Sequence, residues 1–159
     1  IMKSLKELYR IGKGPSSSHT MGPQKAAHIF AAKHQDAQSF EVTLYGSLAA
    51  TGKGHMTDIA IKEVLEKIAP VTIVWRPETF LEFHPNGMIF KAFNAENTLS
   101  SEDWTVYSTG GGALSEGKGE NDIFNTQEVY DMNTLEEILD WCNQTGRSYW
   151  EIASLWMKV

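Results

Sequence analysis

The chain has 159 residues and a net charge of -6, from 14 Lys and Arg against 20 Asp and Glu. Hydrophobic residues make up 42% and charged residues 21%, which is typical of a folded globular protein and too apolar for a disordered one. The acidic balance argues against nucleic-acid binding, and no apolar run reaches the roughly 18 residues that span a membrane. We expect a single cytoplasmic domain over residues 2–159.

The first half of the chain is predicted to alternate helices and strands. Pro23 occupies a position where a first helical residue tolerates proline, and Phe40, Val42 and Leu44 alternate with polar residues at the period of a half-buried strand. Pro70 ends the third helix. The predicted elements are helices at about 3–10, 23–34 and 58–68, strands at 40–44 and 71–75, and a loop over 47–58.

The second half is predicted to contain a hairpin, one further strand and two helices. Asn86-Gly87 lies between two apolar runs in residues 79–93, the pattern of a hairpin with a type I′ turn, and Pro85 favours a sheet edge. Residues 104–109 form a strand that runs into three glycines. Gly146 separates two helices, whose predicted capping boxes are Asn133 with Glu136 and Ser148 with Glu151.

Cys142 is the single cysteine. A disulfide within the chain is therefore impossible, and a cysteine-bound zinc site or iron–sulfur cluster cannot be built from this chain. Helical spacing predicts that Cys142 belongs to a buried stripe with other apolar residues, namely Leu135, Ile138 and Leu139. We expect a core residue and no metal ligand here.

The segment SSSHT, Ser16–Thr20, gathers four hydroxyls and the imidazole of His19 at the start of a helix, between glycines and prolines. Glycine lets a backbone approach a ligand closely, and helix N-termini attract anions, so a small carboxylate or phosphate would suit this loop. The same pattern fits a polar loop that only caps the helix. A serine nucleophile is disfavoured, because the Gly-x-Ser-x-Gly spacing is absent.

The second glycine-rich loop is GKGHMTD, Gly52–Asp58. Its His55 has the side chain whose unperturbed pKa is nearest neutrality, so it can act as base, acid or ligand, although a surface histidine would give the same pattern. A third feature is the run Gly110–Gly112, which either forms a turn with positive φ that binds an anion or is simply flexible.

Three segments together resemble the β part of the iron–sulfur-dependent bacterial L-serine dehydratases. They are GPSSSHTMGP, then YGSLAATGKGH after the first strand, and VYSTGGG further on, in matching order and approximate spacing. The resemblance covers almost the whole chain. The pair GPSSSHT and GKGH is specific, whereas GGG is not.

The resemblance implies an α+β fold with a mixed or antiparallel sheet and helices packed on it, similar to the allosteric substrate-binding domain of phosphoglycerate dehydrogenases. It also implies an α part, as a domain or subunit, that binds a [4Fe–4S] cluster and is not among these residues. The iron would act as Lewis acid on L-serine, which loses water and yields pyruvate and ammonia. A homodimer of the full enzyme is expected, and these residues alone should be inactive.

By motif position, the resemblance makes His55 the candidate base or proton shuttle at Cα, with His19 as the second catalytic residue. It leaves open which histidine is the base, and whether L-serine or L-threonine is preferred. It implies no metal ligand in this chain. The residues expected to hold substrate are Ser16, Ser17, Ser18, Thr20, Gly54, Ser108, Gly110 and Gly111.

Two other functions fit the sequence. The domain could be a regulatory module that binds serine or another small anion, as its implied fold suggests. A weaker alternative is a subunit-assembly domain that dimerises through the predicted hairpin edge, where Phe80 and Phe90 would matter and His55 would not.

Overall fold

A computed structural model describes residues 2–3, 16–96, 98–100, 102–117, 128–130, 132 and 134–156. The chain separates into two compact units, one of residues 12–124 and one of residues 1–11 with 125–159. The helix expected at about 3–10 lies outside the described residues except for Lys3, which belongs to strand β1 (Met2–Lys3).

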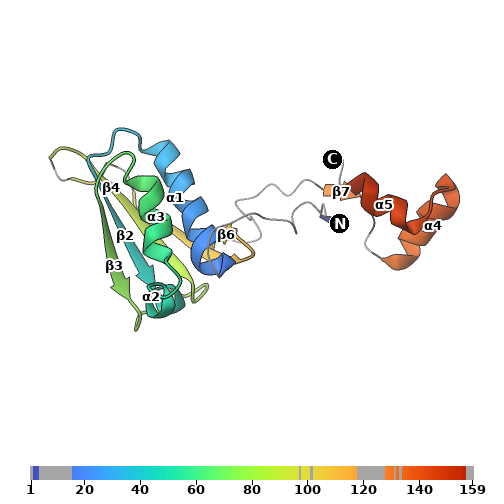
Figure 1. The fold of residues 1–159 in the computed structure, drawn as a ribbon, viewed down its shortest axis with the longest axis horizontal. Helices are drawn as coiled ribbons and strands as arrows, with labels where there is room; N and C mark the ends of the chain where they lie inside the picture. The colour runs from blue at the N-terminus through green and yellow to red at the C-terminus, as the bar shows by residue number, and fades with distance from the viewer. Residues whose placement is uncertain are drawn as a thin grey trace. The chain divides into compact units, whose positions relative to one another are not determined.

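The larger unit is built on a five-stranded mixed sheet with the order β3-β2-β4-β5-β6 (Figure 1). Strands β2 and β3 are parallel, and the other neighbours are antiparallel. This confirms the expected α+β class. The strands are β2 (Ser39–Tyr45), β3 (Val71–Arg76), β4 (Gly87–Phe93), β5 (Trp104–Gly110) and β6 (Ala113–Ser115).

Helices α1 (Gly22–Lys33) and α3 (Thr57–Leu65) pack against one another and against the sheet (Figure 1). On β2, Phe40, Val42 and Leu44 are at most 1% exposed, so the predicted two-residue period does mark a buried face. From α1, Ala26 and Ala27 are fully buried, because a helix with small side chains can approach the sheet closely. A π-helical turn, η2 (Ser17–Met21), precedes α1, and α2 (Gly46–Thr51) follows β2.

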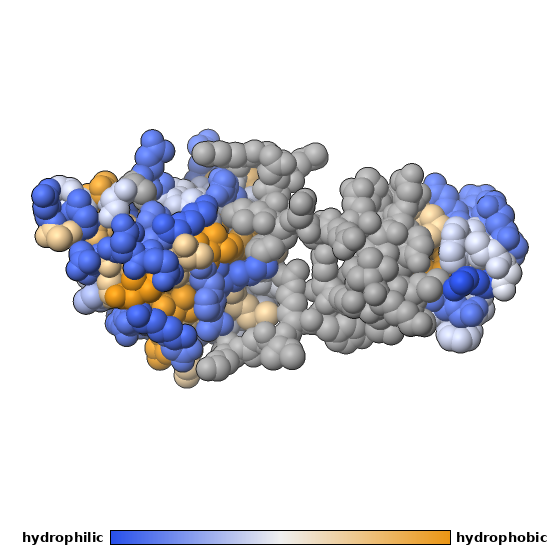
Figure 2. Space-filling view, turned by 90° about the horizontal axis from the view of Figure 1, so that it is seen from above, coloured by the Kyte–Doolittle hydropathy of each residue, from blue (hydrophilic) through white to orange (hydrophobic). Residues whose placement is uncertain are grey.

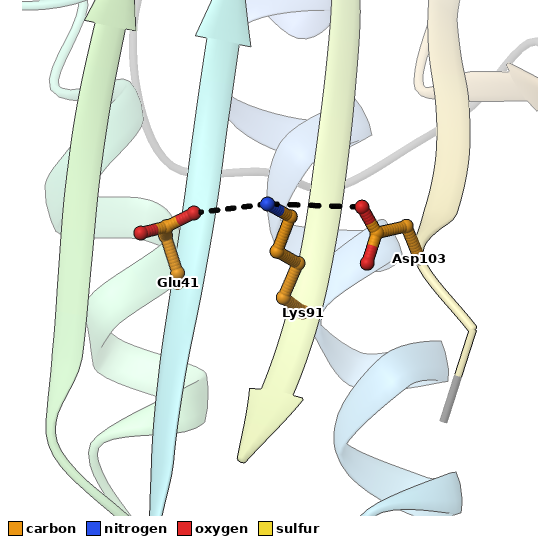
Figure 3. A network of polar contacts seen from close by, with 3 residues as sticks. All are labelled: Glu41, Lys91 and Asp103. Carbon is orange, nitrogen blue, oxygen red and sulfur yellow. Dashed lines mark ion pairs between the residues drawn. The ribbon is translucent and has the colours of Figure 1, made fainter. Parts of the chain in front are cut away.

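The other face of the sheet carries an ion-pair network that links β2, β4 and the residue before β5 (Figure 3). Lys91 Nζ lies 3.4 Å from Glu41 Oε1 and 3.7 Å from Asp103 Oδ2. These side chains are about one-third exposed, so each pair contributes about 0–1 kcal/mol. Such pairs add little to the stability of the fold. Most of the surface of this unit seen in Figure 2 is hydrophilic, with hydrophobic residues visible between the polar ones.

Two predictions for this unit are wrong. The segment 47–51, expected as a loop, belongs to α2. The hairpin over 79–93 does not form, because β4 pairs with β2 on one side and β5 on the other, which leaves no free edge for residues 79–86. Those residues instead cap α2: the amides of Gly46 and Ser47 donate to the carbonyls of Thr79 and Pro85 at 2.9 and 3.0 Å. Phe90 is fully buried, so it cannot lie at a dimer edge.

The smaller unit pairs β1 with β7 (Glu128–Tyr130) and holds helices α4 (Leu135–Thr145) and α5 (Tyr149–Trp156). The first capping box is formed by Thr134 and Glu137, one residue later than predicted, and Asn133 lies outside the described residues. Gly146 ends α4 with a φ of 66°. The second predicted box is formed in part, since Glu151 accepts hydrogen bonds from the Ser148 amide at 2.7 Å and hydroxyl at 2.8 Å.

Helix α4 buries fewer residues than its helical spacing predicts. Cys142 is buried with Ile138 and Ile152, which confirms it as a core residue. Leu135 and Leu139 are 60% and 47% exposed, so this part of the prediction is wrong. Within this unit the core comes mainly from α4 and α5, and a two-helix contact covers only a narrow stripe of each helix.

Gly22 allows α1 to approach β5. A Cβ atom at Gly22 would lie 2.1 Å from Ser108 Oγ and 2.9 Å from Ser108 Cβ, and Ser108 is fully buried. Gly22→Ala should therefore lower the free energy of unfolding by about 1–3 kcal/mol, the usual cost of overpacking, as measured by urea denaturation. Gly54→Ala is the control, because the nearest atom to a Cβ there is Thr51 O at 3.5 Å. Equal losses in both variants would contradict the close contact.

Candidate active site

The two histidine loops meet in the larger unit. His19 lies in η2 at the start of α1, and His55 lies in the turn between α2 and α3. Their ring centroids are 4.9 Å apart and the rings are tilted by 51°. The structure thus brings the two histidine loops together.

Local backbone geometry places both rings. In η2 the amide of Thr20 donates to Ser16 O at 2.9 Å, and this turn leaves His19 only 8% exposed. π-Helical turns are rare and often occur at functional sites. The residue after His55, Met56, has a φ of 59°, the left-handed conformation that few non-glycine residues adopt, and it redirects the chain into α3.

Residues before His19 and residues of α2 occupy the two ring nitrogens of His19 with hydrogen bonds. Its Nδ1 lies 3.0 Å from Ser18 Oγ and 3.2 Å from Ser16 Oγ. Its Nε2 lies 3.0 Å from Thr51 Oγ1 and 3.4 Å from both the carbonyl and the hydroxyl oxygens of Ser47. The ring of His19 therefore joins η2 to α2.

Burial lowers the pKa of His19 below the ordinary histidine value. The hydrogen bond to the Ser47 backbone acts in the opposite direction, and the neighbouring His55 lowers the pKa further. Since the ordinary value is about 6.5 and burial lowers it, the neutral form of His19 is favoured at pH 7.

His55 differs from His19 in its hydrogen bonds. Its backbone amide donates to Thr51 O at 3.3 Å and Gly52 O at 3.2 Å, which holds the turn. Its Nδ1 is buried and has no hydrogen-bond partner among the described residues. A buried nitrogen without a partner is costly, so its retention marks His55 as a candidate functional residue.

Some of the other expected site residues lie around this pair. Ser16 and Ser18 contact the His19 ring directly. Thr20 is buried, and its hydroxyl donates to Ser16 O at 2.5 Å. Gly54 is exposed in the His55 turn, where its amide donates to Thr51 O at 3.0 Å.

The remaining expected residues have different surroundings. Ser17 begins η2, and its carbonyl accepts from the amide of Gly22. Ser108 is fully buried beneath Gly22, so its hydroxyl does not face solvent. Gly110 ends β5 and Gly111 begins the turn to β6, with positive φ values of 109° and 57° that glycine allows.

Ser47 and Thr51 contact His19 and were missed as site residues by the sequence analysis. They are four residues apart, so on a helix they lie on one face. The signal was present in YGSLAATGKGH, but a loop prediction for this segment hides the shared face.

The site also contains a cation above an aromatic ring. Lys53 Nζ lies 5.5 Å from the centroid of the Trp75 ring, so its charge is held against the ring face. Across the described part of the chain, no three His, Cys, Asp or Glu side chains are arranged to hold a metal ion. In the same residues, no helix is both long enough and apolar enough to cross a membrane.

Comparison with known proteins gives consistent matches. The family described as serine dehydratase beta chain matches residues 4–75 and 65–118. An L-serine dehydratase of Helicobacter pylori is 30% identical over 193 residues, covering 96% of this chain and 42% of the relative. L-serine dehydratase 1 of Escherichia coli is 32% identical over 189 residues (92% and 41%), and that of Haemophilus influenzae is 33% identical over 190 residues (91% and 41%). The chain thus spans about 42% of the length of these curated relatives.

Proposed function

The chain belongs to the serine dehydratase beta chain family, and from this premise we propose that it forms one wall of the active site of an L-serine ammonia-lyase. The reaction converts L-serine to pyruvate and ammonia. The observation that carries the proposal is the pair of histidine rings 4.9 Å apart, one from each motif. Because the relatives are more than twice as long as the matched region, the rest of the site would come from outside these residues.

In this proposal His55 is the base. An imidazole that removes a proton needs a free lone pair, and His55 has a buried nitrogen with no partner among the described residues, whereas both nitrogens of His19 are occupied. His55 takes the Cα proton, the Cβ–O bond breaks, and the imidazolium of His55 returns that proton to the departing hydroxide, which leaves as water. The resulting aminoacrylate tautomerises and hydrolyses to pyruvate and ammonia. His19 and its serine neighbours position the substrate.

The residues of this chain do not fit an iron–sulfur cluster. Clusters are held by several cysteine thiolates, and Cys142 is single and buried. We therefore propose that the [4Fe–4S] cluster is bound entirely by the α domain or subunit. That partner would dock over the histidine pair, where Met56 and Ile59 expose apolar side chains next to His55 (55% and 48% exposed). A homodimer of the complete enzyme remains part of this proposal.

The role of His55 is tested in the complete enzyme, with the cluster-binding region present. His55→Ala should lower kcat by a factor of roughly 100 or more, the usual scale for a lost general base. His28→Ala is the matched control, since His28 is exposed on α1. Steady-state kinetics on both variants measure this effect. An unchanged kcat in His55→Ala would exclude His55 as the base.

A second candidate function, small-molecule regulation, is favoured by a hollow at the far end of α1 from His19. This hollow has a volume of about 450 Å³. Its lining carries charges of both signs and aromatic rings, with Lys33 Nζ 5.8 Å from the Trp104 ring centroid and the Trp104 indole donating to Glu116 at 2.7 Å. A small zwitterion such as an amino acid fits these charges. The lining residues are Phe30, Lys33, His34, Glu102, Asp103, Trp104, Thr105 and Glu116.

Calorimetry with L-serine on the 159-residue chain separates the two functions. Under the regulatory proposal, serine binds with millimolar or tighter affinity, Lys33→Ala weakens binding, and His55→Ala does not. Under the lyase proposal, the isolated wall binds serine weakly or not at all, because its partner is needed to complete the cleft. Binding that requires His55 but not Lys33 would contradict the regulatory function.

A further inference from the structure

The hydrogen bonds around His19 determine which ring nitrogen carries the proton. Thr51 Oγ1 donates its single proton to Ser47 O at 2.9 Å, so towards His19 Nε2, 3.0 Å away, it can only accept. Ser47 O, 3.4 Å from the same nitrogen, is also only an acceptor. Nε2 therefore carries the proton.

The opposite nitrogen of neutral His19 must then accept. Nδ1 faces the hydroxyls of Ser18 and Ser16, whose oxygens lie 3.3 Å from each other. Each hydroxyl has one proton, and these protons are directed to the ring or to the neighbouring hydroxyl. The hydroxyl oxygens are left with lone pairs for any further partner.

We propose that Thr51 is a positioning residue: it fixes His19 in the Nε2–H form and thereby makes the hydroxyls of Ser16 and Ser18 an acceptor surface for the ammonium group of a substrate. The consequence for substrate rests on the proposed lyase function, whereas the tautomer does not. The proposed partner of these hydroxyls is a cation, whereas the sequence analysis expects an anion at this loop.

The chain offers matched variants for this proposal. Thr51→Val keeps the shape of the side chain but removes both the acceptor and the donor, and Thr51→Ser keeps them. Thr57→Val makes the same chemical change nearby at a buried hydroxyl that has no partner among the described residues. Thr51 is solvent-exposed, so its substitution should not prevent folding.

The first measurement is the tautomer of His19 in the 159-residue chain labelled with ¹⁵N-histidine. Long-range ¹H–¹⁵N spectra are assigned by the signals lost in His19→Gln. The wild type, Thr51→Ser and Thr57→Val should show the Nε2–H form. Thr51→Val should raise the ratio of Nδ1–H to Nε2–H by roughly 2- to 13-fold, the effect of one net hydrogen bond. An Nδ1–H form in the wild type, or an unchanged ratio in Thr51→Val, overturns the proposal.

The second measurement uses the complete enzyme and two partial substrates as inhibitors. Ethanolamine has the ammonium group without the carboxylate, and 3-hydroxypropionate has the reverse. Thr51→Val should raise the inhibition constant of ethanolamine by roughly 2- to 13-fold and leave that of 3-hydroxypropionate unchanged. Equal weakening of both, or weakening of 3-hydroxypropionate alone, refutes the ammonium assignment. The tautomer result stands or falls separately from the lyase function, because it needs no turnover.

Discussion

The imidazole of His19 is the interaction on which the site depends. It is 8% exposed, burial favours its neutral form, and it joins η2 to α2, two segments about thirty residues apart in the chain. The serine hydroxyls of one loop meet Nδ1, and Thr51 and Ser47 of α2 meet Nε2. A buried polar ring is tolerated only when its nitrogens are satisfied, so burial of His19 brings η2 and α2 together.

The fold supplies the close packing that this arrangement needs. Gly22 lets α1 lie directly on Ser108 of β5, which fixes the start of the helix and therefore η2. In the His55 turn, a Cβ at Gly52 would lie 2.0 Å from Leu48 O and 2.9 Å from the Trp75 ring. Only glycine therefore allows this turn to fold against α2 and β3. The glycines of both loops are thus required for packing, in addition to any contact with a ligand.

The sequence predicts most of the elements whose formation follows from a local residue pattern. The alternation in residues 40–44 and the proline at the start of α1 predict their elements correctly. Asn86-Gly87 misleads, because β4 already has a neighbour on each edge and the carbonyls of Thr79 and Pro85 cap α2 instead. The two histidine motifs point to a shared site, but the contacts of Thr51 depend on a short helix that no local pattern distinguishes from a loop.

The central claim is that His19 and His55 form one site in solution. Nuclear Overhauser spectra of the 159-residue chain test this most directly, because ring centroids 4.9 Å apart should give cross-peaks between the protons of the two imidazoles. Phe30 and Phe90, whose centroids are 5.3 Å apart in the core, provide an internal reference. The account predicts cross-peaks for both pairs. Cross-peaks between the phenylalanines without any between the histidines would contradict it.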